Sequence, residues 1–157
     1  MTGITPCLWF DGRAEEAAEF YTSVFPNSKI SNVVRAPKGG TPSNAAGSVM
    51  VVEFNLDGRD FVALNGGPQF KFTEAVSFQV HVADQAELDH FWDAFTDGGE
   101  AGPCGWCKDR FGLSWQVIPV RLLELLQDPD PERSQKAFTA MMDMTRIDVA
   151  AVEAKVS

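Results

Sequence analysis

The chain has 157 residues, and 13 lysines and arginines stand against 22 aspartates and glutamates, which gives a net charge of −9. This acidic balance argues against nucleic acid and anionic membranes as partners, because both bind basic surfaces. No apolar run approaches the roughly 20 residues of a membrane span, and the N-terminus shows no signal peptide. Three cysteines are too few for a disulfide scaffold. We therefore expect a single globular domain, residues 1–157, that is cytoplasmic.

The first part of the chain predicts a strand, a helix and three further strands. The helix carries apolar residues at helical spacing, and Asp57-Gly58 is a strong hairpin signal between the last two strands. Residues 36–47 are rich in Gly, Pro, Ser and Asn and predict a loop. The expected elements are strand 4–10, helix 14–25 and strands 29–35, 48–56 and 60–65.

The second part predicts the same order, followed by helices. Gly98-Gly99 is typical of a helix end, and residues 109–112 predict a turn between two short strands. The expected elements are strand 75–82, helix 85–96, strands near 102–106 and 113–119, and helices 121–127, 132–144 and 147–154.

The two predicted helices carry matching apolar stripes. Ala17, Phe20, Tyr21 and Val24 recur 71 positions later as Leu88, Phe91, Trp92 and Phe95. A fixed spacing of this kind indicates an internal repeat. It predicts two strand–helix–strand–strand–strand modules, about 4–72 and 73–119, and a helical tail over about 120–157.

Several sequence strings resemble one family along nearly the whole chain. They are ITPCLWF (4–10), EAAEFY (16–21), LNGGP (64–68), CGWCKDRFGLSWQ (104–116) and DPDPE (128–132). With the duplicated module they resemble the PhnB-like branch of the vicinal oxygen chelate superfamily, whose members are often labelled 3-demethylubiquinone methyltransferase-like. The resemblance implies an α+β fold, the glyoxalase/bleomycin resistance fold, in which tandem βαβββ modules form a half-barrel cavity.

Strand alternation then assigns residues to the cavity side of each expected strand. Leu8 and Phe10 should pack on the first helix, and Phe78, Val80 and Val82 on the second. The expected ligand-binding residues are Thr5, Cys7, Trp9, Asn65, Ser77, Gln79 and Gln116. Asn65 is placed in the cavity together with Phe61 and Ala63. Glu53 and His81 are the candidate catalytic residues, as a general acid–base pair if they converge; the alternative is an exposed strand carboxylate and a structural imidazole.

The resemblance also locates the positions at which metal-dependent relatives bind their ion. They fall on Thr5, Ala63, Ser77 and Gln116, which include no carboxylate or imidazole. We therefore expect no metal and no cofactor. S-adenosylmethionine sites need a strand, a Gly-rich turn and a helix. Gly66-Gly67-Pro68 precedes another strand, which argues against methyl transfer.

The Cys104-Gly105-Trp106-Cys107 motif is the remaining chemical signal. A redox dithiol of this spacing begins a helix, but here the motif lies among short strands, so we interpret it as structural. Asp109 and Arg110 are interpreted as turn residues.

The sequence leaves three functions open. The first is a metal-free protein that binds an unidentified small organic molecule as a homodimer, with sheet edges and apolar tail surface covered by the partner. The second is a metal-dependent lyase, isomerase or dioxygenase of glyoxalase type, with ligands such as Glu53, His81 and Gln116. The third is a drug or metabolite sequestration protein of bleomycin-resistance type.

Overall fold

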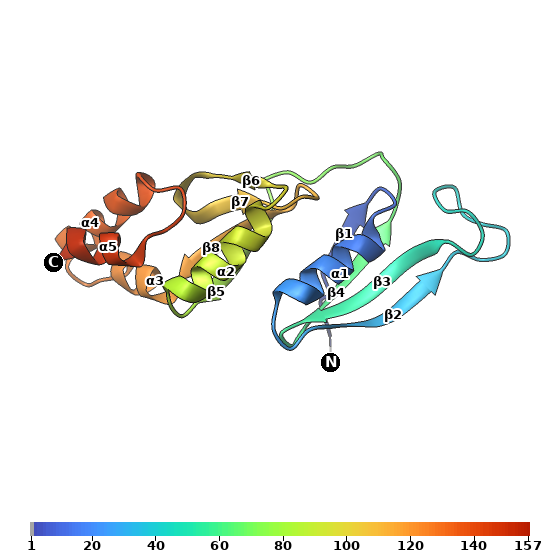
Figure 1. The fold of residues 1–157 in the computed structure, drawn as a ribbon, viewed down its shortest axis with the longest axis horizontal. Helices are drawn as coiled ribbons and strands as arrows, with labels where there is room; N and C mark the ends of the chain where they lie inside the picture. Colours follow the sequence, from blue (N-terminus) through green and yellow to red (C-terminus); the bar gives the residue numbers. More distant parts are fainter. Residues whose placement is uncertain (1) are drawn as a thin grey trace. The chain divides into compact units, whose positions relative to one another are not determined.

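The structure is a computed structural model, and it describes residues 2–157 (Figure 1). The chain divides into two compact units, the first ending at Lys71 and the second spanning Phe72–Ser157. Each unit holds one four-stranded mixed sheet built in the order β-α-β-β-β, and three helices follow in the second unit. This confirms the α+β fold with tandem βαβββ modules and C-terminal helices. Within residues 2–157, no helix has the length and apolar character needed to cross a membrane.

The first unit contains one helix and four strands. They are β1 (Cys7–Phe10), α1 (Ala14–Val24), β2 (Lys29–Arg35), β3 (Val49–Leu56) and β4 (Arg59–Asn65). The sheet order is β1-β4-β3-β2, in which β1 is parallel to β4 and the other pairs are antiparallel.

The second unit repeats this topology. Its elements are β5 (Ser77–Val82), α2 (Gln85–Thr96), β6 (Glu100–Ala101), β7 (Trp106–Lys108) and β8 (Ser114–Pro119). The sheet order is β5-β8-β7-β6, again with the first strand parallel to the last.

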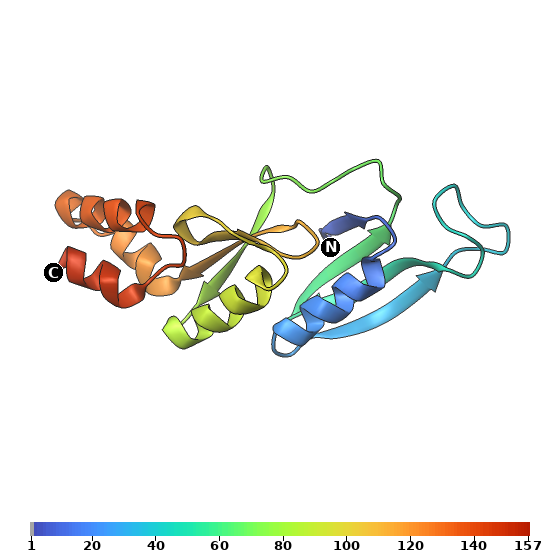
Figure 2. The same cartoon turned by 45° about the horizontal axis from the view of Figure 1, so that its top comes forward.

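One helix covers one face of each sheet (Figure 2). In the first unit the ring of Tyr21 stacks on Phe54 at 6.1 Å, and Phe54 stacks on Phe61 at 5.5 Å. In the second, Phe95 of α2 stacks on Trp115 of β8 at 4.4 Å. These aromatic contacts form the cores that the apolar helix stripes predict. We call the opposite side of each sheet its open face.

The C-terminal helices belong to the second unit. They are α3 (Val120–Leu126), α4 (Pro131–Met142) and α5 (Val149–Val156). Asp130 and Asp148 cap α4 and α5 by accepting hydrogen bonds from backbone N–H groups in the first turns. Ile147 and Val152 are buried, and the Ile147 side chain lies against Gly105, so the tail packs on the rest of the second unit.

Two expected strands differ from the structure. The first strand begins at Cys7 rather than residue 4, after Pro6, whose carbonyl accepts the hydrogen bond from Val62 N. The strand expected near 102–106 is wrong, because residues 103–105 form a 3-10 turn between β6 and β7. Cys104 lies in that turn with φ of +57°, a left-handed conformation that breaks a strand.

Candidate functional site

Four polar residues that the sequence singled out form one hydrogen-bonded chain on the open face of the second sheet. His81 Nε2 lies 3.1 Å from Gln79 Oε1, and Gln79 Nε2 donates to Gln116 Oε1 at 3.4 Å. Gln116 Nε2 then donates to Ser77 Oγ at 2.8 Å. The register pairs Ser77 with Ser114 and Gln79 with Gln116, which places this polar chain across the adjacent strands β5 and β8.

The polar chain has a direction. An amide oxygen only accepts, so His81 Nε2 carries the proton in the bond to Gln79, and in this tautomer Nδ1 is an acceptor. At the other end, Ser77 Oγ accepts from Gln116, so its hydroxyl hydrogen remains free to donate. Linked bonds of this kind polarise one another. The polar chain therefore offers an acceptor at His81 and a donor at Ser77.

The open face of the first sheet carries Cys7, Trp9 and Glu53. Cys7 and Glu53 both pair with Val62 of β4, so the three strands present these side chains on one side. Partial burial raises the pKa of the Cys7 thiol, which disfavours the thiolate that a nucleophile needs. Glu53 is exposed and belongs to the first unit, while His81 is exposed and belongs to the second. Their action as a pair stays a prediction.

Trp9 is held by its own unit. Its indole N–H donates to Gly67 O at 2.9 Å, and its ring meets Phe70 edge-on at a centroid distance of 5.0 Å. The ring also covers Gly66 so closely that an added Cβ would lie 2.4 Å from it. The Trp9 side chain is thus held in place by contacts within the first unit. Thr5 precedes β1 and is exposed.

Asn65 does not lie on the open face, which corrects the expected placement. The hairpin register pairs Phe54 with Phe61 and Val52 with Ala63, so Phe61, Ala63 and Asn65 share the side that faces α1. Asn65 is buried, accepts from Ala14 N at 2.9 Å and donates to Val49 O at 3.0 Å. It fixes the start of α1 to the sheet.

The positions that the family resemblance assigns to a metal do not fit one. Ala63 is buried against α1 and has no donor atom, and Ser77 and Gln116 bond to each other. Thr5 supplies only a hydroxyl. Divalent ions in proteins take several carboxylate, imidazole or thiolate ligands. Within residues 2–157, no three His, Cys, Asp or Glu side chains gather as such a set.

The cysteine motif lies within the second unit. Both Cys104 and Cys107 are free thiols, and Cys107 is buried in β7 on the side that faces α2. Burial, with the nearby Asp109 carboxylate, raises the pKa of Cys107 to about 12. Asp109 accepts from the N–H groups of Phe111 and Leu113 and from Trp115 Nε1. It holds the 109–112 turn, as the sequence predicted.

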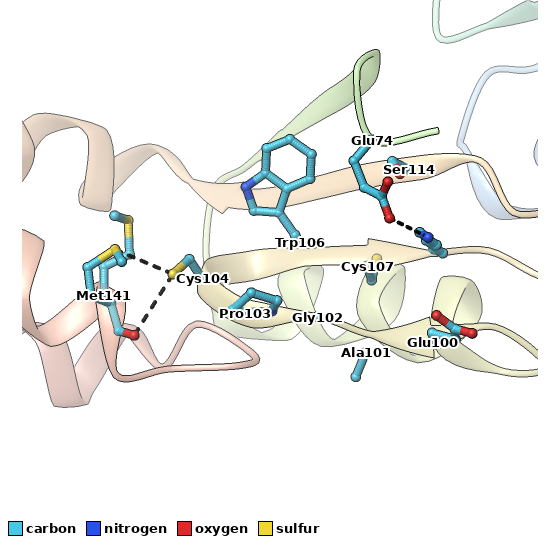
Figure 3. A pocket seen from close by; sticks show the side chains of 12 residues that line it. Glu74, Glu100, Ala101, Gly102, Pro103, Cys104, Trp106, Cys107, Ser114 and Met141 are labelled. Carbon is cyan, nitrogen blue, oxygen red and sulfur yellow. Dashed lines mark hydrogen bonds and ion pairs between the residues drawn. The ribbon is translucent and has the colours of Figure 1, made fainter. Parts of the chain in front are cut away.

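A pocket that the sequence analysis missed lies on the second unit. Its volume is about 660 Å³, and it is bounded by β6, β7, Ser114 of β8 and the end of α4 (Figure 3). Trp106, Ser114 and Met142 are among the residues that line it. Period-two alternation along 106–108 and 114–116 places Trp106 and Ser114 on the same side as Gln116, but their lack of partners is visible only in the structure.

Comparisons with known proteins agree with this architecture. The family model described as 3-demethylubiquinone-9 3-methyltransferase matches residues 2–118. A search of curated proteins gave no match. Among solved structures, a putative 3-demethylubiquinone-9 3-methyltransferase, PhnB protein, from Bacillus cereus is 31% identical, with a TM-score of 0.66. The match covers 75% of this chain and 99% of that one.

More distant structures share the fold alone. A Pseudomonas aeruginosa protein is 21% identical over 76% of this chain and 98% of its own, with a TM-score of 0.59. The fosfomycin resistance protein FosX from Listeria monocytogenes is 12% identical over 85% of this chain and 98% of its own, with a TM-score of 0.51. The family match and the 31% identity together show that this chain belongs to the 3-demethylubiquinone-9 3-methyltransferase family, the PhnB-like branch of the vicinal oxygen chelate superfamily.

Proposed function

We propose that the chain binds a small polar organic molecule, without a metal ion, on the open face of its second sheet. The observation that carries this proposal is the polar chain His81–Gln79–Gln116–Ser77, whose bonds of 3.1, 3.4 and 2.8 Å fix each side chain. Neutral amides held in this way orient a ligand by hydrogen bonds rather than by charge. A ligand that donates at one end and accepts at the other matches the direction of the polar chain.

A small ligand bonds to one part of the polar chain rather than spanning it. Ser77 and His81 lie four residues apart on β5, which corresponds to about 13 Å of extended strand. A proton removed from a ligand would be taken by His81 Nδ1, because Nε2 is already bonded to Gln79. His81 is therefore the proposed acid–base residue, and Glu53 is the second candidate.

Methyl transfer, the reaction in the family's description, does not follow from the residues of this chain. S-adenosylmethionine is held on Rossmann-like folds by a Gly-rich turn that leads from a strand into a helix. Gly66 and Gly67 follow β4, and the next element is β5 rather than a helix. Gly66 is moreover covered by the Trp9 ring. We therefore derive no methyl-transfer step.

We also propose that the protein acts as a homodimer. Each sheet ends in two edge strands, β1 and β2 in the first and β5 and β6 in the second, and unpaired edges favour association with another chain. Light scattering during gel filtration tests this proposal: a mass near twice the 17.2 kDa of one chain supports it, and a single-chain mass contradicts it.

The ligand-binding proposal is tested through the two histidines. In a ¹⁵N-labelled protein we would titrate lactate, glycolamide and acetohydroxamate and follow the ring nitrogens of His81, with His90 as internal reference. His90 is exposed on α2, away from the polar chain. We expect at least one probe to shift the His81 nitrogens and leave those of His90 unchanged. The substitution Gln116→Leu, which breaks two bonds of the chain, should weaken this binding about tenfold.

The outcomes separate the alternatives. Equal shifts at both histidines, or binding that Gln116→Leu leaves intact, would contradict the proposal. Stoichiometric zinc, manganese or nickel retained by the wild type and lost from Gln116→Leu would overturn the metal-free part. Turnover of a bound probe would identify an enzyme, and binding without turnover would identify a sequestration protein.

A further inference from the structure

The pocket of the second unit contains an aromatic wall without a partner. Trp106 is half-buried, its ring stacks on no other ring, and its indole N–H meets no acceptor within residues 2–157. The contrast with Trp115 is clear, since that indole donates to Asp109 Oδ2 at 2.8 Å and stacks on Phe95. Tryptophans that are packed for stability usually have both kinds of contact. Trp106 thus presents an aromatic face and a donor that the protein does not use.

A second unused group lies at the other end of the same pocket. Ser114 is 1% exposed, and its Oγ is a buried side-chain oxygen without a hydrogen-bond partner. A buried hydroxyl without a partner destabilises the fold, and a bound ligand could supply the missing hydrogen bond. Figure 3 shows Ser114 beside Glu74, which forms an ion pair with Lys108. Both charged side chains are partly exposed, and such a pair costs little to displace.

The tail helices supply a third wall. Met141 and Met142 reach the pocket from α4, and Met142 is 52% exposed. The tail is fixed to the pocket floor because Cys104 N donates to Met144 O at 2.7 Å and Gly105 N donates to Thr145 O at 2.8 Å. The Cys104 sulfur also contacts the Met142 sulfur at 3.6 Å. Thioether sulfurs make favourable contacts with aromatic rings. The tail residues Met141, Met142, Met144 and Thr145 lie beyond the family match, which ends at residue 118.

We propose that this pocket binds a flat, largely apolar aromatic molecule that carries one hydrogen-bonding oxygen. Its ring would lie between the Trp106 indole and the methionines, and its oxygen would bond to Ser114 Oγ. The volume of about 660 Å³ falls within the range of small-molecule sites. No member of the polar chain lines the pocket, so this inference does not depend on the proposed function.

The test uses 1-naphthol as the probe and naphthalene as its matched analogue without the oxygen. In protein labelled with ¹³C at the methionine methyls, 1-naphthol should shift the Met141 and Met142 signals through its ring current. Met50, which lies in the first unit, is the internal reference. Trp106→Leu should weaken binding of both probes about tenfold. Ser114→Ala should weaken 1-naphthol about fivefold and leave naphthalene unchanged.

Both variants should fold, because Trp106 has no ring partner and Ser114→Ala removes an unsatisfied group. Ser134→Ala, at a half-buried position of α4 that does not line the pocket, is the matched control and should bind like the wild type. Unshifted Met141 and Met142 methyls would overturn the proposal, as would an equal loss of both probes in Ser114→Ala. Methyl shifts that depend on protein concentration without any probe would assign the pocket to a second copy of the chain and equally overturn it. Shifts at His81 are not expected, so failure here is distinct from failure of the polar-chain proposal.

Discussion

Trp9 and Trp106 lie on the open faces of two sheets with the same topology, but only Trp106 is free. Trp9 donates to Gly67, meets Phe70 and covers Gly66, so the first unit satisfies it completely. Trp106 has no ring contact and no acceptor within residues 2–157, and a pocket lies against it. The repeat therefore preserves the topology while the use of the open face diverges. The first face is packed by its own loop, and the second retains groups that a ligand can use.

The buried polar residues show the same divergence in another form. Asn65 ties α1 to the first sheet through two hydrogen bonds, and Asp109 ties a turn to the second sheet through three. Both are structural, and neither belongs to an open face. Substituting them tests how much each unit depends on its own internal anchor.

The largest expected effect is that of Asp109→Ala. Its carboxylate serves three donors, including the buried Trp115 indole, so we expect a loss of about 3–5 kcal/mol in the free energy of unfolding. Asn65→Ala leaves fewer groups unpaired, so we expect a smaller loss of about 2–3 kcal/mol in the free energy of unfolding. Urea unfolding measures both. An Asp109→Ala loss no larger than that of Asn65→Ala would show that the second unit does not rely on this turn.

The local parts of this architecture were predictable from sequence. The helix stripes and the Asp57-Gly58 hairpin depend on neighbouring residues, and the 71-residue spacing compares two such local patterns; the structure confirms each. Alternation along β5 and β8 also predicts that Ser77, Gln79, His81 and Gln116 share one side of the sheet, and the register agrees. Alternation fails where the backbone leaves the strand conformation. The turn at Cys104, with its positive φ, is fixed by hydrogen bonds to the distant residues Met144 and Thr145.

Asn65 was misplaced for a reason that the sequence itself contains. A two-residue hairpin at Asp57-Gly58 pairs Leu56 with Arg59, and so Phe54 with Phe61. Phe61, Ala63 and Asn65 must then follow Phe54 to the helix side. Counting outward from the hairpin would have given the correct face. Trp106 and Ser114 are different, because the absence of partners is a tertiary property that no local pattern encodes.

A second test disrupts the packing of Trp9 on the open face of the first sheet. Gly66→Ala places a Cβ 2.4 Å from the Trp9 ring, so the indole must move and its bond to Gly67 must weaken. We expect a loss of about 1–3 kcal/mol in the free energy of unfolding. The Trp9 signal in ¹⁹F NMR of 5-fluorotryptophan protein should also shift, while that of Trp106 stays in place.

Gly39→Ala is the matched control for this substitution. Nothing lies within 4 Å of a Cβ built on Gly39, and its backbone has no positive φ. It should leave both the stability and the Trp9 signal close to those of the wild type. An unchanged Trp9 signal in Gly66→Ala would mean that the first face is not closed by this contact, and the contrast between the two tryptophans would lose its physical basis.

The last effect is a pH dependence at Cys107, which follows Trp106 on β7 but faces α2 instead of the pocket. Burial raises its pKa to about 12, whereas the thiol in the unfolded chain ionises near 9.0. Between these values the unfolded state binds fewer protons than the folded state, so this contribution to stability is complete below pH 9 and is lost as the pH rises toward 12. The loss is about 1.4 kcal/mol per pH unit within that window. Urea unfolding at pH 8, 9 and 10 measures it.

Two cysteine variants test whether this pH dependence of stability comes from the Cys107 thiol. Cys107→Ala should remove the slope of about 1.4 kcal/mol per pH unit, because the ionising thiol is gone from both states. Cys104→Ala removes a thiol from the turn beside the pocket and should keep it. An unaltered slope in Cys107→Ala would show that another group causes it and that burial does not raise the pKa of the Cys107 thiol. The contrast between Cys107, buried against α2, and Trp106, which faces the pocket, would then not hold.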